Sequence, residues 1–96
     1  MKFIKYWEVA DGALDEAVEK WGKYLEKSAK TPEKFPRYIF PPHIVGDTMK
    51  GISIMEADNE EQLMNYIAEL FPPLKIKFLP LLPSSEYIPI YMKAKK

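Results

Sequence analysis

The side chains best suited to acid–base chemistry in this sequence are one histidine and two glutamates. His43 is the only histidine among the 96 residues. Its unperturbed pKa lies near neutrality, which suits a general base or a haem ligand. Glu8 and Glu56 each end a predicted strand, where a carboxylate commonly caps an amide or faces solvent. Burial in a cavity would raise the pKa of either glutamate and make it a proton shuttle.

A competing structural interpretation applies to each of these groups, and we favour it for His43. The histidine lies in a run of apolar residues, as a ring packed on a sheet would. Aromatic residues on the strands, such as Tyr6 and Trp7, could line a cavity beside it, or could simply form the core. The predicted ligand-contacting set is His43, Tyr6, Trp7, Glu8, Ser53, Met55 and Glu56. No catalytic residue is assigned.

The composition excludes several classes of site. The chain has no cysteine, so it has no disulfide, thiolate zinc site or iron–sulfur ligand. A metal site needs several ligands, and a second histidine is absent, so we predict no metal and no cofactor. The sequence has no glycine-rich phosphate loop and no nucleophile elbow. Asp47 is interpreted as a turn residue.

Charge and hydropathy limit the partners and the compartment. Fourteen basic and 14 acidic side chains give a formal net charge of zero. We therefore expect no nucleic-acid partner, because nothing attracts the chain to phosphate over a distance. No apolar run approaches the ~18 residues that a membrane span requires. The N-terminus lacks the apolar core of a signal peptide. We expect a cytoplasmic protein without a membrane partner.

The elements that must position the candidate residues follow from periodicity and from proline. Residues 2–9 predict a strand, and Asp11 predicts an N-cap for a helix over residues 12–27. The proline-rich segment that follows suits an edge or bulged strand, because proline cannot donate to the ladder. Residues 46–51 predict a hairpin turn, and residues 51–57 the second strand of that hairpin.

The second half of the chain predicts one more helix and one more strand. Asp58 and Glu61 have the spacing of a capping box, which begins the helix. Its predicted apolar side comprises Leu63, Met64, Ile67, Ala68, Leu70 and Phe71. Residues 74–83 predict the last strand, and the tail around Pro89 is expected to be an ordered edge segment. The order β-α-β-β-α-β over residues 1–96 predicts a single ferredoxin-like α+β domain, with an antiparallel sheet and two helices on one face.

Alternation in the first strand raises the question of what covers the other face of the sheet. Phe3, Lys5 and Trp7 point one way, whereas Ile4 and Tyr6 point the other way. Both sets carry large apolar side chains, and the sequence does not say which set meets the helices. An exposed apolar face usually marks an interface or a ligand groove. We therefore expect a homodimer in which sheet packs against sheet.

The run "GISIMEADNEEQLMNYIAELFPPLKIKFLPLLPSSE" resembles a small uncharacterised family, a domain of unknown function, in the dimeric α/β-barrel superfamily. The resemblance rests on Met55-Glu56-Ala57-Asp58 at a strand end, and on the later strand of residues 76–81 with Pro80 inside it. It implies a dimeric ferredoxin-like fold and no particular reaction. Two hypotheses follow. The first is a homodimer that binds a small hydrophobic molecule between the sheets, or that is purely structural. The alternative, by fold analogy, is a cofactor-independent monooxygenase or isomerase acting on a small aromatic or polyketide-like substrate.

Overall fold

The computed structural model describes residues 1–46 and 48–95, so Asp47 with its predicted turn role lies outside the described residues. The elements are β1 (Lys2–Val9), α1 (Leu14–Lys30), the short 3-10 helix η1 (Pro32–Lys34), β2 (Arg37–Ile44), β3 (Lys50–Glu56), α2 (Glu60–Leu70), β4 (Leu74–Pro80) and α3 (Ser84–Ala94). The last strand thus ends at Pro80, earlier than the predicted residue 83.

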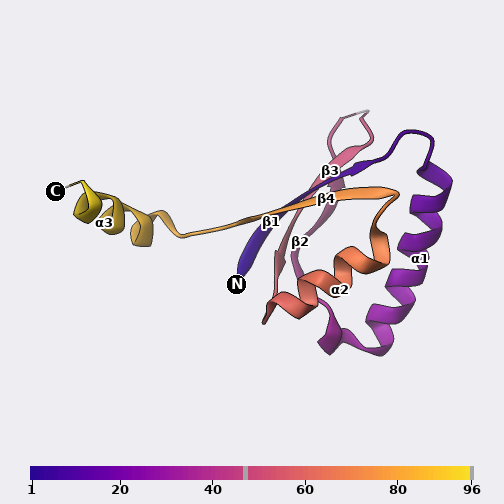
Figure 1. Ribbon diagram of the computed structural model, residues 1–96, viewed down its shortest axis with the longest axis horizontal. Coiled ribbons are helices and arrows are strands. Elements are labelled where there is room, and N and C mark those ends of the chain that lie inside the picture. The colour runs from indigo at the N-terminus through magenta and orange to yellow at the C-terminus, as the bar shows by residue number, and fades with distance from the viewer. Residues whose placement is uncertain (47, 96) are drawn as a thin grey trace.

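The four strands form one open antiparallel sheet in the order β2-β3-β1-β4. Figure 1 shows α1 and α2 on the same side of this sheet. The fold is therefore α+β, and its strand order is compatible with the predicted ferredoxin-like arrangement. The proline-rich strand β2 lies at an edge, as predicted, and its pairing with β3 shifts register on both sides of Phe40.

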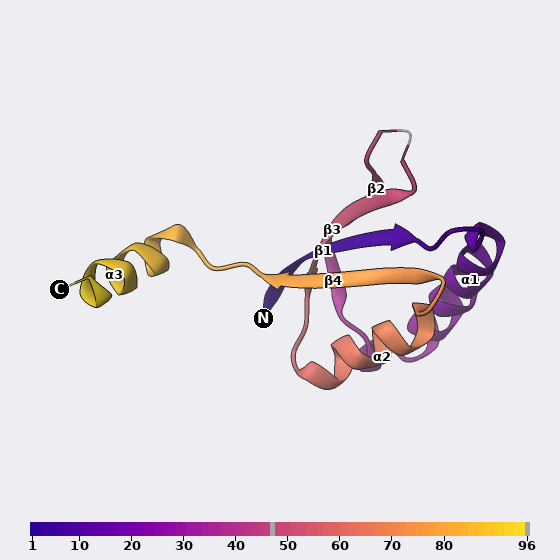
Figure 2. The same ribbon diagram turned by 45° about the horizontal axis from the view of Figure 1, so that its top comes forward.

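Strand parity decides which residues meet the helices. In β1, Lys5 is buried, and Trp7 and Val9 are half-buried against the core, whereas Tyr6 and Glu8 are exposed. Tyr24 of α1, Met55 of β3 and Tyr66 of α2 form much of the rest of the core. These side chains, together with those of β1 that pack against them, are called here the helix-facing layer. The opposite side of the sheet is called here the open face, and none of the described helices lies over it (Figure 2).

Helix α1 begins later than predicted. Gly12 has a φ of +70°, which is incompatible with the helical conformation, and the helix starts at Leu14 with Ala13 as its N-cap. Asp11 therefore does not cap it, and the helix extends to Lys30 instead of residue 27. Only Ala17 and Tyr24 are buried among the apolar side chains at helical spacing, and Val18 is 63% exposed. These apolar side chains are Leu14, Ala17, Val18, Trp21, Tyr24 and Leu25. The sheet therefore leaves part of the apolar side of α1 uncovered.

Helix α2 buries only part of the predicted apolar side, and its buried side is turned toward Gln62 and Tyr66. Its buried residues are Gln62, Tyr66 and Leu70, whereas Met64 is 62% exposed. Counting only apolar residues missed this side, because Gln62 and Tyr66 have polar groups that find partners when buried. The N-cap is Asn59, whose side chain accepts a hydrogen bond from the Gln62 amide at 2.9 Å, so the predicted cap at Asp58 is displaced by one residue.

The C-terminal tail is a helix and not the predicted edge segment. Helix α3 contains Pro89, none of its residues is buried, and it extends away from the domain (Figure 1). Residues 81–95 are called here the arm. Tyr87 and Tyr91 lie one helical turn apart with their rings stacked at 6.3 Å. No helix among the described residues is long and apolar enough to span a bilayer.

Candidate functional site

The central group of the candidate site is a lysine inside the helix-facing layer. Lys5 is only 2% exposed, although its strand neighbours on the open face are accessible. Its Nζ donates a hydrogen bond to the Tyr66 hydroxyl, and the Tyr38 hydroxyl lies 3.5 Å from the same nitrogen. The two hydroxyls are 2.8 Å apart. One amine and two phenols, from β1, β2 and α2, therefore form a connected polar group inside an aromatic layer.

No carboxylate balances this lysine within residues 1–46 and 48–95. The ion pairs of these residues all involve other basic side chains, and all of them lie at the surface. A charge without a counterion is costly to bury. Desolvation accordingly lowers the pKa of Lys5 from 10.5 to about 7. Close to half of the Lys5 side chains are then neutral amines at neutral pH, against roughly one in a few thousand for an ordinary lysine.

Three aromatic rings surround the Lys5 nitrogen. The ring centroids of Tyr66, Tyr38 and Trp21 lie 4.7, 5.2 and 5.8 Å from Nζ. These distances fall within the range in which a ring quadrupole attracts a cation. Desolvation also raises the pKa of Tyr66 and of Tyr38. Both phenols therefore stay protonated at neutral pH, and each has a proton to donate.

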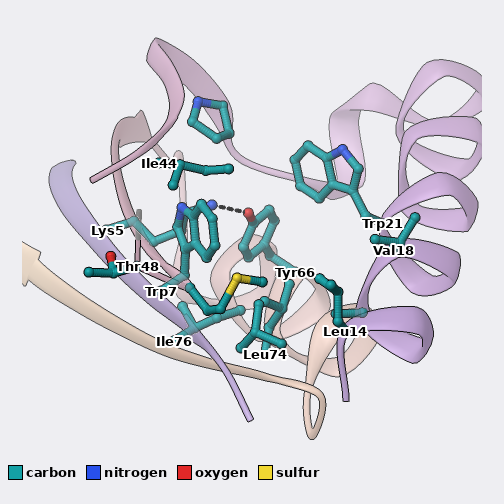
Figure 3. A pocket seen from close by; sticks show the side chains of 14 residues that line it. Lys5, Trp7, Leu14, Val18, Trp21, Ile44, Thr48, Tyr66, Leu74 and Ile76 are labelled. Carbon is teal, nitrogen blue, oxygen red and sulfur yellow. Dashed lines mark hydrogen bonds between the residues drawn. The ribbon is translucent and has the colours of Figure 1, made fainter. Parts of the chain in front are cut away.

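Lys5 forms part of the wall of a cavity between the sheet and α1, called here the Lys5 pocket. Its volume is about 410 Å³. The lining residues are Lys5, Trp7, Val9, Leu14, Ala17, Val18, Trp21, Pro42, Ile44, Thr48, Met49, Tyr66, Leu74 and Ile76. Figure 3 shows Lys5, Trp7 and Tyr66 close together on one side, with Trp21 and Val18 reaching in from α1. The pocket is of a size and apolar character typical of small-molecule sites.

The incomplete cover of the apolar side of α1 explains why the pocket exists. Leu14 and Val18 are 47% and 63% exposed, yet both line the cavity. A helix pressed onto the sheet would bury these side chains against Trp7 and Ile76. Their exposure therefore indicates that the cavity opens to solvent beside α1, which gives a ligand a way in.

Trp7 supplies a second polar group to the pocket. Its indole nitrogen is buried and has no acceptor among the described residues. The ring lies over Gly51 of β3: a Cβ atom at Gly51 would collide with the indole and would also come within 2.5 Å of the His43 carbonyl oxygen. A glycine at this position therefore allows the indole to lie against the sheet. A ligand oxygen that reached the indole N–H would satisfy a donor that the protein leaves unpaired.

The structure divides the predicted ligand-contacting set between the two faces of the sheet. Trp7 lines the Lys5 pocket, and Ser53 and Met55 lie fully buried in the helix-facing layer. The Ser53 hydroxyl has no hydrogen-bond partner among the described residues. Tyr6 and Glu8 line a second hollow of about 440 Å³, and Trp7 forms part of its wall as well. The predicted residues therefore do not converge on one site.

His43 and Glu56 lie away from the Lys5 pocket. His43 pairs with Ile52 on the open face, its ring stacks on Phe40 at 4.3 Å, and its Nδ1 is 2.6 Å from the Pro41 carbonyl oxygen. The Glu56 carboxylate forms an ion pair with Arg37 at 3.3 Å. These surroundings support the structural interpretation of both residues, and they place His43 where it cannot reach the amine of Lys5.

The sequence analysis missed Lys5, Tyr66 and Trp21 as site residues. A signal for Lys5 was present, because alternation places it on the same side of β1 as Phe3 and Trp7. A lysine between two large apolar residues on a strand must either reach an edge or be buried. Tyr66 and Trp21 carried no such signal, since only the tertiary fold brings their helices to β1.

A metal centre finds no support in the side-chain arrangement. Over residues 1–46 and 48–95, no group of three or more His, Asp or Glu side chains is placed to hold an ion.

Comparisons of the chain with protein-family models, with curated proteins and with solved structures found no match. The resemblance to the dimeric α/β-barrel family therefore stays a prediction.

Proposed function

We propose that this protein binds a small apolar molecule that carries an oxygen acceptor, in the Lys5 pocket. The observation that carries the proposal is the position of the Lys5 amine, buried without a carboxylate partner in the wall of an apolar cavity. Such a group lowers the stability of the fold at neutral pH, because no ion pair offsets the cost of desolvating its charge. Buried ionisable groups of this kind mark functional sites more than structural ones.

The chemistry of the wall defines the ligand class. Aliphatic and indole side chains favour an alkyl or aryl body, and the volume of about 410 Å³ accommodates a chain of several carbons. The Lys5 amine and the unpaired Trp7 N–H are donors, so the polar end of the ligand must accept. A carboxylate would supply the missing counter-charge of protonated Lys5. The ligand thus lies between the sheet and α1 of one chain, and not between two sheets.

Octanoate, with 1-octanol as its uncharged counterpart, provides a direct test. The two tryptophans of the chain, Trp7 and Trp21, both line the pocket, so intrinsic fluorescence reports its occupancy. A charge-assisted hydrogen bond contributes about 1.5–3 kcal/mol, so Lys5→Met should weaken octanoate binding roughly 10- to 100-fold. Octanol binding should change little. Lys30→Met, which removes an exposed lysine of α1, is the matched control.

The pH dependence of binding gives a second readout. Octanoate affinity should fall as the pH rises from 6 to 8, because Lys5 loses its charge near pH 7. Octanol affinity should stay constant over the same range. A tryptophan spectrum that neither ligand changes, or equal octanoate affinities for the wild type and Lys5→Met, would refute the proposal.

We further propose that the protein is a homodimer joined through the open faces of its sheets. Two central rows of this face are mostly apolar: Ile52 and Tyr6 with His43 and Lys77, and Ile54 and Ile4 with Phe40 and Leu79. Charged residues, among them Glu8, Lys50, Lys75, Arg37 and Glu56, form the rows on either side. An apolar centre inside a charged rim is the usual anatomy of an interface.

The dimensions suit a second copy of the chain. Four strands of seven to eight residues span an area roughly 20 Å on a side, so two such faces would bury on the order of 1,000 Å² or more. The arm adds to this contact, because its three-residue linker and 11-residue helix extend about 25 Å beyond β4. That length equals a strand, and the apolar side chains of α3 would cover part of the second copy.

Sedimentation velocity at low micromolar concentration tests the dimer. The wild type should sediment as a dimer, and Ile54→Lys, which charges the centre of the open face, should yield monomers. Met64→Lys is the control, because Met64 is exposed on the other layer. A monomeric wild type would refute the dimer and leave the ligand proposal standing. The alternative of a cofactor-independent monooxygenase or isomerase stays a prediction.

A further inference from the structure

We infer that Lys5 is a nucleophilic amine that captures apolar aldehydes or ketones as a protonated imine. This inference rests on the proposed small-molecule pocket and names a reactive class of ligand for it. The geometry that supports it is the amine in the wall of the Lys5 pocket, in contact with a phenol that can move a proton. The tests below separate its failure from a failure of the pocket itself.

The first requirement of the reaction is an amine with a free lone pair. Burial without a counterion lowers the pKa of Lys5 to about 7, so a large fraction of the amine is unprotonated in neutral solution. The groups facing it come from every neighbouring element: Tyr66 of α2, Tyr38 of β2, Trp21 of α1, and its strand partners Ser53 and Phe78. None of these groups carries a negative charge at neutral pH, so none favours the protonated form of Lys5. Lysine desolvated in an apolar pocket is a recognised form of activated nucleophile.

The second requirement is a proton route for the oxygen that leaves. The Lys5 lone pair attacks the carbonyl carbon, and the carbonyl oxygen takes up a proton to give a carbinolamine. The oxygen then departs as water after a second proton transfer, and the carbon–nitrogen double bond forms. One carbonyl compound and one amine thus give one imine and one water, with no oxidant or reductant. The Tyr66 hydroxyl, bonded to Nζ and 2.8 Å from the Tyr38 hydroxyl, is the group placed to carry these protons.

The third requirement is stabilisation of the cation that results. Protonation of this imine by solvent places a positive charge on Nζ, where no carboxylate of the described residues forms an ion pair with it. The rings of Tyr66, Tyr38 and Trp21 at 4.7–5.8 Å provide cation–π attraction at the position of the charge. The same rings exclude water, which slows hydrolysis of the imine.

Reductive trapping with octanal tests the inference on the intact protein. The protein is incubated with octanal and sodium cyanoborohydride near pH 7, and intact mass and peptide mapping locate the added octyl group. The expected result is preferential labelling of Lys5 over the exposed lysines of the same molecule. The trapping rate of Lys5 should rise through about pH 7, well below the range in which an ordinary lysine loses its proton.

Three variants and a competitor sharpen the result. Lys5→Met should abolish the preferred label, and Lys30→Met should retain it. Tyr66→Phe should slow trapping at least tenfold while the fold is intact by circular dichroism. Octanoate should protect Lys5 by occupying the pocket. Labelling spread evenly over the exposed lysines would overturn the imine inference. If octanoate and octanol still bind in that case, the pocket stands. If neither binds, the proposed function fails as well.

Discussion

Replacing Lys5 by methionine should remove a pH dependence of stability that arises from the burial of the Lys5 amine. In the folded protein the pKa of Lys5 is lowered to about 7, while in the unfolded chain it returns to about 10.5. Between these values the unfolded chain binds more protons than the native state. The free energy of unfolding of the wild type should therefore rise with pH in this window, because stability follows the proton difference.

The magnitude follows from the proton difference. A difference of one proton changes the free energy of unfolding by 1.36 kcal/mol per pH unit, so the wild type should gain roughly 2 kcal/mol between pH 7 and pH 9. Lys5→Met lacks the titrating group and should show no such gain. It should also be the more stable protein at pH 7, since an apolar side chain of similar length replaces an unpaired buried charge.

Urea unfolding at pH 7, 8 and 9, followed by tryptophan fluorescence at fixed protein concentration, measures the difference. The range stops at pH 9 because Tyr66, Tyr38 and Tyr24 have raised folded pKa values. Above the unfolded pKa of 10, the unfolded chain loses protons that these folded tyrosines keep. The free energy of unfolding then falls with pH, which would mask the effect of Lys5. Lys30→Met, which removes an exposed lysine of α1, is the control and should follow the wild type. Parallel pH profiles for the wild type and Lys5→Met would refute the burial of an unpaired charge at this position.

Four further variants test other parts of the structure. Gly51→Ala should destabilise the fold by about 1–3 kcal/mol in urea, because its Cβ meets both the Trp7 indole and a backbone carbonyl oxygen; Gly22→Ala, with open space around it in α1, should instead stabilise by up to about 1 kcal/mol. His43→Ala should leave octanoate affinity unchanged but weaken the dimer in sedimentation, and a loss of octanoate binding would contradict its place on the open face. Deletion of residues 84–96 should also weaken the dimer, whereas an unchanged dissociation constant would show that the arm does not contact the second copy.

The proline-rich segment illustrates what local chemistry determines without tertiary information. Pro41 and Pro42 cannot donate to a sheet ladder, so the residue type alone predicted an edge or bulged strand. Strand β2 lies at an edge and its pairing shifts register. Likewise, the alternation of β1 separated Lys5 and Trp7 from Tyr6 and Glu8 before any packing was considered. Both features are confirmed. They depend only on the missing amide hydrogen of proline and on the two-residue period of a strand, which act within a few residues.

The misplaced helix ends and faces illustrate where local patterns fail. Asp11 has the right chemistry for an N-cap, but the positive φ of Gly12 starts the helix later. The arm carries alternating apolar residues, yet it forms a helix, because no strand of this chain pairs with it. In α2, the buried side is set by Gln62 and Tyr66, whose polar groups find partners on η1 and β1. Hydrophobicity alone assigns such residues to solvent.

For the candidate site, the sequence by itself determined the order of the four strands and first two helices along the chain, the balanced charge and the lack of thiol chemistry. It also determined the side of β1 on which Lys5 and Trp7 lie. Only the tertiary structure decided that Tyr66, Tyr38 and Trp21, from three other elements, surround the amine of Lys5 while no carboxylate among the described residues does. The physical reason is that a pKa depends on the solvent and charges within a few ångströms of the group. Those neighbours lie 16 to 61 residues away along the chain, a separation that no local period encodes.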